Sequence, residues 1–188
     1  RLVDRTSSMS TEAIVAGALG SASFVTATDT PGFESVATVT FRTAGRVEVG
    51  GKVELVMPSE PGAQYGWRFT DGAALSSLET SGTSNAPGVS FVASGSIGTP
   101  TAAAVGYNVS NRTLVFTVAA HDLAQNTTYV FSITNVLTPS STVGAANVIA
   151  TTFDAQDRLV DRTLSMTTEA IVAGALGSAS FVTATDTP

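Results

Sequence analysis

The sequence contains no cysteine and only one histidine, His121. The lack of cysteine excludes a disulfide framework, a thiol nucleophile and a cysteine-based zinc site. A single histidine cannot complete a zinc ligand set without cysteine. Charged residues make up only 13% of the chain, about half the share usual in a soluble domain. Such a surface must be wetted by hydroxyl groups or attached sugars.

Clustered basic charge and long hydrophobic runs are also missing. The nine basic residues are scattered and the net charge is −6, which argues against a nucleic-acid partner and against attraction to anionic membranes. The longest weakly polar stretch, Ala13 to Ala27, is interrupted by two glycines and two serines, so it is too short and too broken to span a bilayer. We expect no nucleic acid and no membrane insertion.

The most informative feature present is a duplication of 31 residues. Residues 1–31 and 158–188 differ only at Ser7, which corresponds to Leu164, and at Ser10, which corresponds to Thr167. Identity at 29 of 31 positions is far closer than strand chemistry requires, because a pleated surface tolerates many substitutions. The offset of 157 residues therefore predicts a tandem repeat of that period, long enough to bury a core of its own.

We expect three parts along the chain. Residues 1–12 are the end of a preceding unit, residues 13–163 are one repeat unit, and residues 164–188, the copy of 7–31, begin the next unit.

The pattern inside the unit has period two and is interrupted by turn residues, which is typical of short β-strands. The expected strands are 35–42, 46–57, 65–69, 88–93, 113–119, 127–136 and 146–153. Gly50-Gly51 marks a bulge or a tight hairpin within the second of them. Ser10 to Leu19 could form a helix, but Ile14, Val15 and the following SFVTAT run favour a strand. The series predicts an all-β, antiparallel β-sandwich.

The duplicated segment is expected to lie at a junction between units. Residues 152–160 read as a strand, an Asx-rich turn and a further strand, which ties the junction residues Arg158, Leu159, Val160, Asp161 and Arg162 to the preceding domain. The start of the segment is tied in the same way to the domain that follows. One interpretation is strand exchange, in which each unit lends a strand to its neighbour. The alternative is a string of complete domains joined by a short linker.

Three sequons for N-glycosylation are present, at Asn108, Asn111 and Asn126. Each fits Asn-x-Ser/Thr without an intervening proline and stands at an expected turn or strand start. They account for three of the six asparagines, so chance matches are a competing explanation in a chain this rich in serine and threonine. N-linked glycans are the expected modification, and residues 80–87 and 138–142 suit O-glycosylation.

Catalytic and metal sites receive little support. His121 has a neighbouring carboxylate but no nucleophile context, and nothing brings Glu54, Glu60, Asp71 and Glu79 together for glycoside chemistry. We expect no enzyme, no catalytic residues and no cofactor. The alternative is calcium at Asp154, Asp157 and Asp161, with Asp4 as the counterpart of Asp161. Their spacing matches no loop motif, and Arg158 and Arg162 compete for the same carboxylates.

Several runs resemble the Ig-like β-sandwich repeats of large surface proteins of algae and other protists. They are Phe24–Thr28, Ser35–Phe41, Gly50–Pro58, Tyr129–Val136, Thr138–Ser141 and Thr151–Asp154. The resemblance extends to glycosylated extracellular fibrils built from such repeats. It implies a structural role at the cell surface or outside the cell, with neighbouring copies of the repeat as partners, and no catalytic residues.

A second functional class stays open. An adhesin-like module could bind carbohydrate or another surface through its loops or through the aromatic group Tyr65, Trp67 and Phe69. Alternation within this run predicts that one of its faces is buried. Exposure of Trp67 would favour binding, whereas burial against Phe41, Phe116 or Phe131 would favour a scaffold.

Overall fold

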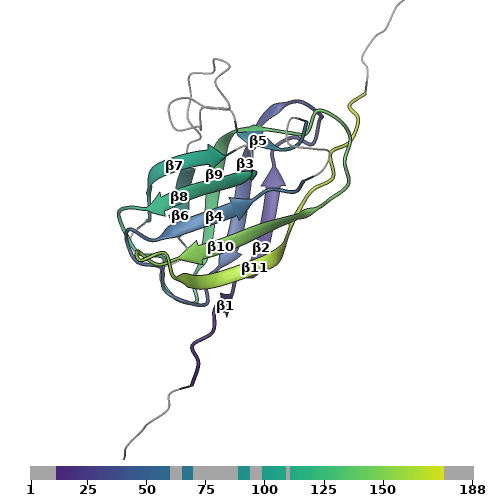
Figure 1. Cartoon of the computed structure of the whole chain (residues 1–188). Coiled ribbons are helices and arrows are strands. Elements are labelled where there is room, and N and C mark those ends of the chain that lie inside the picture. Colours follow the sequence, from purple (N-terminus) through teal and green to yellow (C-terminus); the bar gives the residue numbers. More distant parts are fainter. Residues whose placement is uncertain (1–11, 60–64, 70–88, 94–98, 109–110, 176–188) are drawn as a thin grey trace, which may run out of the picture.

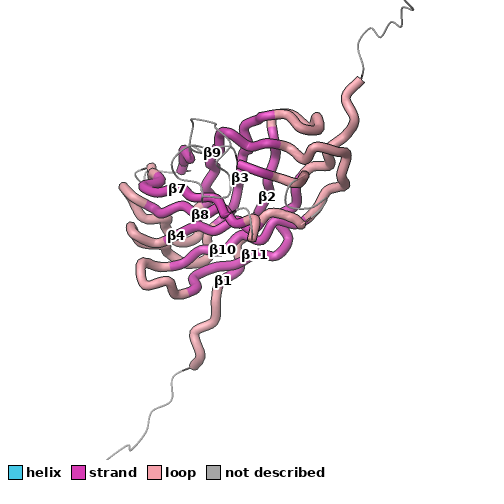
Figure 2. Tube along the Cα trace, turned by 45° about the horizontal axis from the view of Figure 1, so that its top comes forward, coloured by secondary structure: helices cyan, strands magenta, loops and turns pink. Residues whose placement is uncertain are grey.

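The computed structural model describes residues 12–59, 65–69, 89–93, 99–108 and 111–175, and these residues form strands and connecting loops without a helix (Figures 1 and 2). The strands are β1 (Gly17–Ala18), β2 (Gly20–Thr26), β3 (Glu34–Arg42), β4 (Lys52–Val56), β5 (Arg68–Phe69), β6 (Val89–Ala93), β7 (Ala102–Asn108), β8 (Thr113–Val118), β9 (Thr128–Leu137), β10 (Asn147–Phe153) and β11 (Leu159–Thr168). The burial pattern follows the sequence alternation. In β3, Val36 and Thr38 face outward, while Ala37 and Val39 are buried, because successive strand residues point to opposite faces.

The strands form one mixed sheet that curls into a nearly closed barrel (Figure 1). Its order is β5-β9-β3-β2-β11-β10-β4-β8-β7, with β6 pairing β9 and β1 pairing β11. An isolated bridge between Ser90 of β6, which pairs with β9, and Thr101, just before β7, links the β9 side of the sheet to its β7 edge. Closure of this kind covers the sheet edges that an open sheet would expose.

The core of the barrel is built from aromatic side chains supplied by four different strands. Phe41, Phe91, Phe116 and Phe131 are all buried, and their rings meet at centroid distances of 5.1–5.7 Å. Ring pairs in this range contribute beyond the area that they bury. The core therefore links β3, β6, β8 and β9 across the interior of the barrel.

The all-β prediction is confirmed, two finer parts of the fold prediction are not confirmed, and one local expectation needs correction. The sheet is not wholly antiparallel, because β1 and β2 both run parallel to β11. A sandwich of two separate sheets is not confirmed either, since hydrogen bonding continues around the barrel. Gly50-Gly51 forms a turn rather than a hairpin, because Val47 pairs with Leu123 and not with β4.

The strand boundaries show where the sequence pattern was weakest. Of the expected run 10–19, the described residues contain only the two-residue strand β1 and no helix. Strand β7, whose sequence AAAVGYN is poor in β-formers, was not expected. The expected boundary between residues 163 and 164 falls inside β11, and Met166 and Ile171 beyond it belong to the same buried core.

Candidate functional site

The two copies of the duplicated segment occupy adjacent positions in this sheet. The first copy supplies β1 and β2 from its second half, and the second copy supplies β11 from its first half. Gly17 is in register with Asp161, and Phe24 with Thr168. Among the described strands, the first copy therefore contributes its second half to the sheet, and the second copy contributes its first half.

Tight local connections hold these halves in place. A turn joins β10 to β11. In it, the Arg158 amide donates to the Asp154 Oδ1 atom at 2.9 Å, and the Asp154 amide donates to the Arg158 carbonyl at 2.9 Å. Asp157 in the same turn has a positive φ of 60°. This geometry confirms the expected Asx-rich turn. On the other side, β2 continues into its antiparallel neighbour β3 through residues 27–33.

Asp161 is the central residue of this arrangement. It is fully buried, and its carboxylate accepts hydrogen bonds from the backbone amides of Ala44 and Gly45, at 3.0 Å each. Its own amide donates to the Thr152 Oγ1 atom at 3.1 Å. Charge-assisted bonds to backbone amides satisfy a buried carboxylate that would otherwise be very costly. Asp161 thus fastens β11 to the loop after β3.

Of the other predicted junction residues, Arg158 lies in the turn before β11, and Leu159, Val160 and Arg162 lie on β11 itself. The Arg158 Nε atom donates to the Asp154 Oδ2 atom at 2.6 Å. Hydrogen bonds from the amides of Arg158 and Gln156 and from the Arg158 side chain lower the pKa of Asp154, with the Arg158 amide as the largest cause. Leu159 is 45% exposed, Val160 packs against the core, and Arg162 is exposed.

Beyond β11, the chain docks against the far end of the barrel. Ile171 is buried and exchanges two backbone hydrogen bonds with Val143, at 2.9 and 3.1 Å. The Val172 amide donates to the Asp29 carbonyl at 3.0 Å. The corresponding residue of the first copy, Ile14, is fully exposed at the opposite end. The same local sequence therefore places its isoleucine in the core in the second copy and in solvent in the first copy.

The carboxylates considered for calcium do not converge on one point. Asp161 accepts from backbone amides, Asp154 from its own turn, and Asp157 from the Lys52 Nζ atom at 2.5 Å. Among the described residues, no group of three histidine, cysteine or acidic side chains is arranged to hold a metal ion. Asp4 lies outside the described residues.

The three predicted glycosylation sites lie on the surface. Asn108 ends β7, Asn111 stands in the turn before β8, and Asn126 stands before β9, and all three are exposed. Asn126 has a positive φ of 55°. The side chain of Asn111 stabilises its turn, because the Oδ1 atom accepts a hydrogen bond from the Thr113 amide at 3.2 Å. Of the O-glycosylation candidates, residues 80–87 lie outside the described residues.

The aromatic group proposed for binding contributes mainly to the core. Trp67 is 2% exposed and meets Phe24 edge-on at 5.5 Å, so its ring partner is not one of the three phenylalanines expected. Phe69 is buried and packs against Tyr107. Only Tyr65 of the group is exposed.

The residues weighed for catalysis are dispersed. His121 is exposed, and the neighbouring Asp122 accepts from the Arg46 side chain and from the Val49 amide. The Arg46 hydrogen bond is the largest cause that lowers the pKa of Asp122. Glu54 lies on β4, while Glu60, Asp71 and Glu79 lie outside the described residues.

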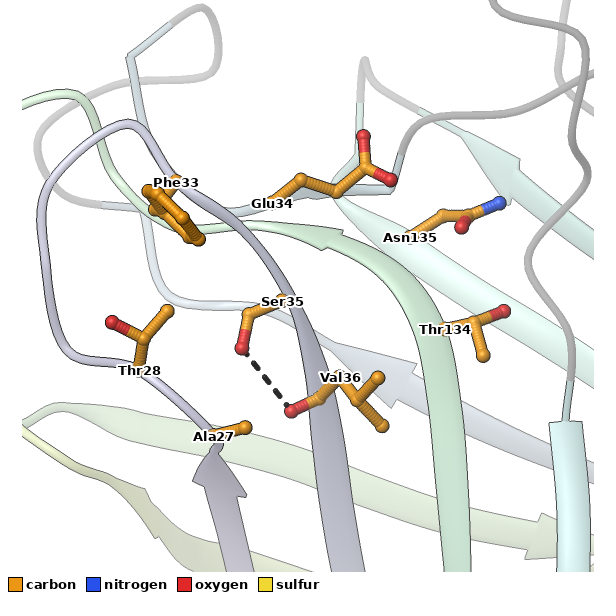
Figure 3. Close-up of a pocket in the computed structure, with 8 residues that line it drawn as sticks. All are labelled: Ala27, Thr28, Phe33, Glu34, Ser35, Val36, Thr134 and Asn135. Atoms are coloured by element: carbon orange, nitrogen blue, oxygen red, sulfur yellow. Dashed lines mark hydrogen bonds between the residues drawn. The ribbon is translucent and has the colours of Figure 1, made fainter.

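A shallow depression of about 440 Å³ lies between the connection after β2, the start of β3 and the end of β9 (Figure 3). Its lining combines the exposed ring of Phe33 with Glu34, Thr134 and Asn135. No local sequence pattern marks this depression, because its residues come together only through the pairing of β3 with β9.

None of the described residues lies in a helix that is long and apolar enough to cross a membrane. No protein-family model matches the chain, and a search of curated proteins found no match either.

Proposed function

We propose that this chain is a structural repeat of a glycosylated extracellular fibre or cell-surface filament, with units joined head to tail through the duplicated segment. The observation that carries the proposal is the parallel placement of β1 and β2 beside β11. Residues 12–16 precede β1 near the start of β11, and residues 169–175 follow the end of β11, so the described chain enters and leaves at opposite ends of the barrel (Figure 1). Repetition of such a unit extends along a line.

The core and the surface both support a structural role. Trp67 and Phe69 are used to fill the interior, as expected for a scaffold rather than for an aromatic binding platform. Stability in a tandem array adds unit by unit through neighbouring interfaces. The proposal includes a relationship to the Ig-like β-sandwich repeats that the sequence runs resemble. The nearly closed barrel and the parallel pairing of β11 with β1 and β2 distinguish this unit from an antiparallel sandwich.

Exposed sequon asparagines support the extracellular part of the proposal, because N-glycans are added to secreted chains at accessible Asn-x-Ser/Thr sites. Peptide mapping of native material, with and without enzymatic removal of N-glycans, tests it. We expect occupied sites at Asn111 and Asn126. Unmodified peptides at Asn108, Asn111 and Asn126 would contradict the glycoprotein assignment.

Electron microscopy of native material tests the fibre assignment directly. We expect filaments with a regular axial repeat that bind an antibody raised against residues 12–175. Labelling of dispersed particles or of a non-filamentous surface layer would reject the fibre. Pre-incubation of the antibody with the purified chain provides the control for specific labelling.

An adhesin-like, carbohydrate-binding module is the alternative, and the depression of Figure 3 favours it specifically. An exposed aromatic ring beside carboxylate and amide groups is a suitable surface for a sugar. Titration with mannose and N-acetylglucosamine oligosaccharides, followed by NMR, tests this alternative. Shifts confined to residues around Phe33 and lost in Phe33→Ala, but not in Val25→Ala, would favour it over the scaffold.

A further inference from the structure

The sequence EAIVAGA occurs twice, at 12–18 and at 169–175. In its second occurrence, Ile171 is buried and bonded to Val143 at the C-terminal end of the barrel. In its first occurrence, Gly17 and Ala18 form β1 beside Asp161 and Arg162 at the N-terminal end. Each occurrence thus displays one of two roles, docking to the unit before it or pairing within the unit after it.

We propose that, between consecutive units, one copy performs both roles at once, so that the units abut end to end with only two residues between them. The isoleucine docks in the preceding unit as Ile171 does. Three residues later, the glycine joins the sheet of the following unit as Gly17 does. Only the valine and alanine that correspond to Val172 and Ala173 remain between these anchors. The inference rests on the proposed function in one respect, that units follow each other in tandem.

The two roles are mutually compatible. At the C-terminal end, a Cβ atom on Gly174 would lie 3.6 Å from the Thr30 Cγ2 atom, an ordinary contact, so docking does not itself require glycine there. At the N-terminal end, the matching Gly17 has no room for a Cβ, because Asp161 and Ala44 occupy that space. At a junction, packing in the following unit therefore requires glycine at this position, whereas the contact with the preceding unit would also accept alanine.

The short spacing places the two barrels in contact. Three residues span at most ~10 Å when fully extended. A depression of about 360 Å³ lies at the N-terminal end, lined by Val15, Ala44, Gly45, Leu159 and Val160 among others. The partner for this surface is the C-terminal end of another copy, which carries the half-exposed Val172. Apolar side chains that are exposed in one unit are thereby covered by the next.

The axial repeat follows from the same register. Gly17 lies beside Asp161. The distance along the fibre axis from Gly17 to Gly174 is therefore limited by the length of the 13-residue stretch that leads from Asp161 to Gly174. An extended chain of that length covers ~45 Å. We therefore infer an axial repeat of no more than ~45 Å for each 157-residue unit, with adjacent units held in a fixed relative orientation.

A two-unit chain, residues 1–188 followed by a second 32–188, tests this inference. This junction reproduces the natural sequence, because residues 169–188 are identical to residues 12–31. We expect its Tm to exceed that of the 188-residue chain by roughly 3–10 °C. Its maximum dimension in small-angle X-ray scattering should exceed that of the single chain by no more than ~45 Å.

Matched variants identify the interface. Insertion of Gly-Ser-Gly-Ser between Val172 and Ala173 at the internal junction should return Tm to the single-unit value and broaden the distance distribution. The same insertion between Val15 and Ala16 of the first unit should change neither. Leu159→Glu in the second unit should also abolish the Tm gain, whereas Leu159→Glu in the first unit, which faces no preceding barrel, should leave the gain intact.

Equal Tm values for the one-unit and two-unit chains, together with scattering typical of flexibly linked domains, would overturn the inference. That outcome is distinct from failure of the proposed function. Docked units in a native protein that is not filamentous would reject the fibre alone, and native filaments built from flexibly linked units would reject the docking alone.

Discussion

Gly17 lies beside Asp161 across two parallel strands, so close that a Cβ atom on Gly17 would overlap the Asp161 Oδ1 atom and lie 2.7 Å from the Ala44 Cβ atom. This contact joins the two copies of the duplicated segment, because Gly17 belongs to the first and Asp161 to the second. The buried carboxylate is thus enclosed by backbone on two sides, from β1 and from the loop after β3.

Gly17→Ala should destabilise the 188-residue chain by roughly 1–3 kcal/mol, because the methyl group displaces β1 or the Asp161 carboxylate. Gly174→Ala alters the same position of the other copy, where the methyl group meets only the Thr30 Cγ2 atom at 3.6 Å. It should change the free energy of unfolding by less than ~0.5 kcal/mol. Urea unfolding followed by Trp67 fluorescence measures both. Equal effects would show that the two copies are not placed as described.

Asp161→Ala should cost roughly 2–4 kcal/mol of the free energy of unfolding, because it leaves the Ala44 and Gly45 amides without their acceptor. Asp157→Asn, in the turn that precedes β11, is the control, because asparagine tolerates the positive φ of 60° at this position. The Asp157 side chain is 68% exposed and pairs with Lys52, so loss of its charge should cost less than ~1 kcal/mol. Chemical denaturation at neutral pH compares them, and a near-neutral Asp161→Ala would refute the anchoring role.

Ile171→Ala should destabilise the single-unit chain by roughly 2–5 kcal/mol, since it empties a buried site at the end of the core. Ile14→Ala removes the same side chain from the same local sequence, but from a fully exposed position. It should leave the unfolding midpoint within experimental error. Thermal unfolding of the two variants side by side provides the measurement, and comparable losses would contradict the split of the duplicated segment.

Acid should weaken the fold through Asp154 and Asp122, whose pKa values are lowered in the folded state by hydrogen bonds. A lowered folded pKa means that the unfolded chain binds protons first as the pH falls. The stabilisation is therefore complete above the ordinary aspartate pKa of ~3.9 and is lost as the pH falls below it.

Asp154→Asn tests this dependence, because an amide oxygen can still accept from the Arg158 and Gln156 amides but does not titrate. Plots of Tm against pH between pH 6 and 3 should fall less steeply for the variant than for the natural sequence. Parallel curves would show that Asp154 contributes nothing to the acid sensitivity.

Several features of the fold could be predicted from local sequence. Alternation in β3, β8 and β9 indicates which face of each strand is buried, because successive strand side chains point to opposite faces. The Asp154–Arg158 turn was likewise predictable from its Asx residues. Strand β7 was missed because alanine and glycine give weak β signals, and its pairing with β8 supplies the stabilisation that the local sequence lacks.

The duplication itself, and hence the period of 157 residues, was determined by the sequence alone. What the sequence left open was how two nearly identical segments are used by one domain. The tertiary structure decided this, because parallel pairing between β11 and β1 joins residues more than 140 positions apart, and local pattern carries no information on such partners. The same long-range pairing makes Asp161 a buried anchor for the loop after β3, since its carboxylate accepts hydrogen bonds from the amides of Ala44 and Gly45.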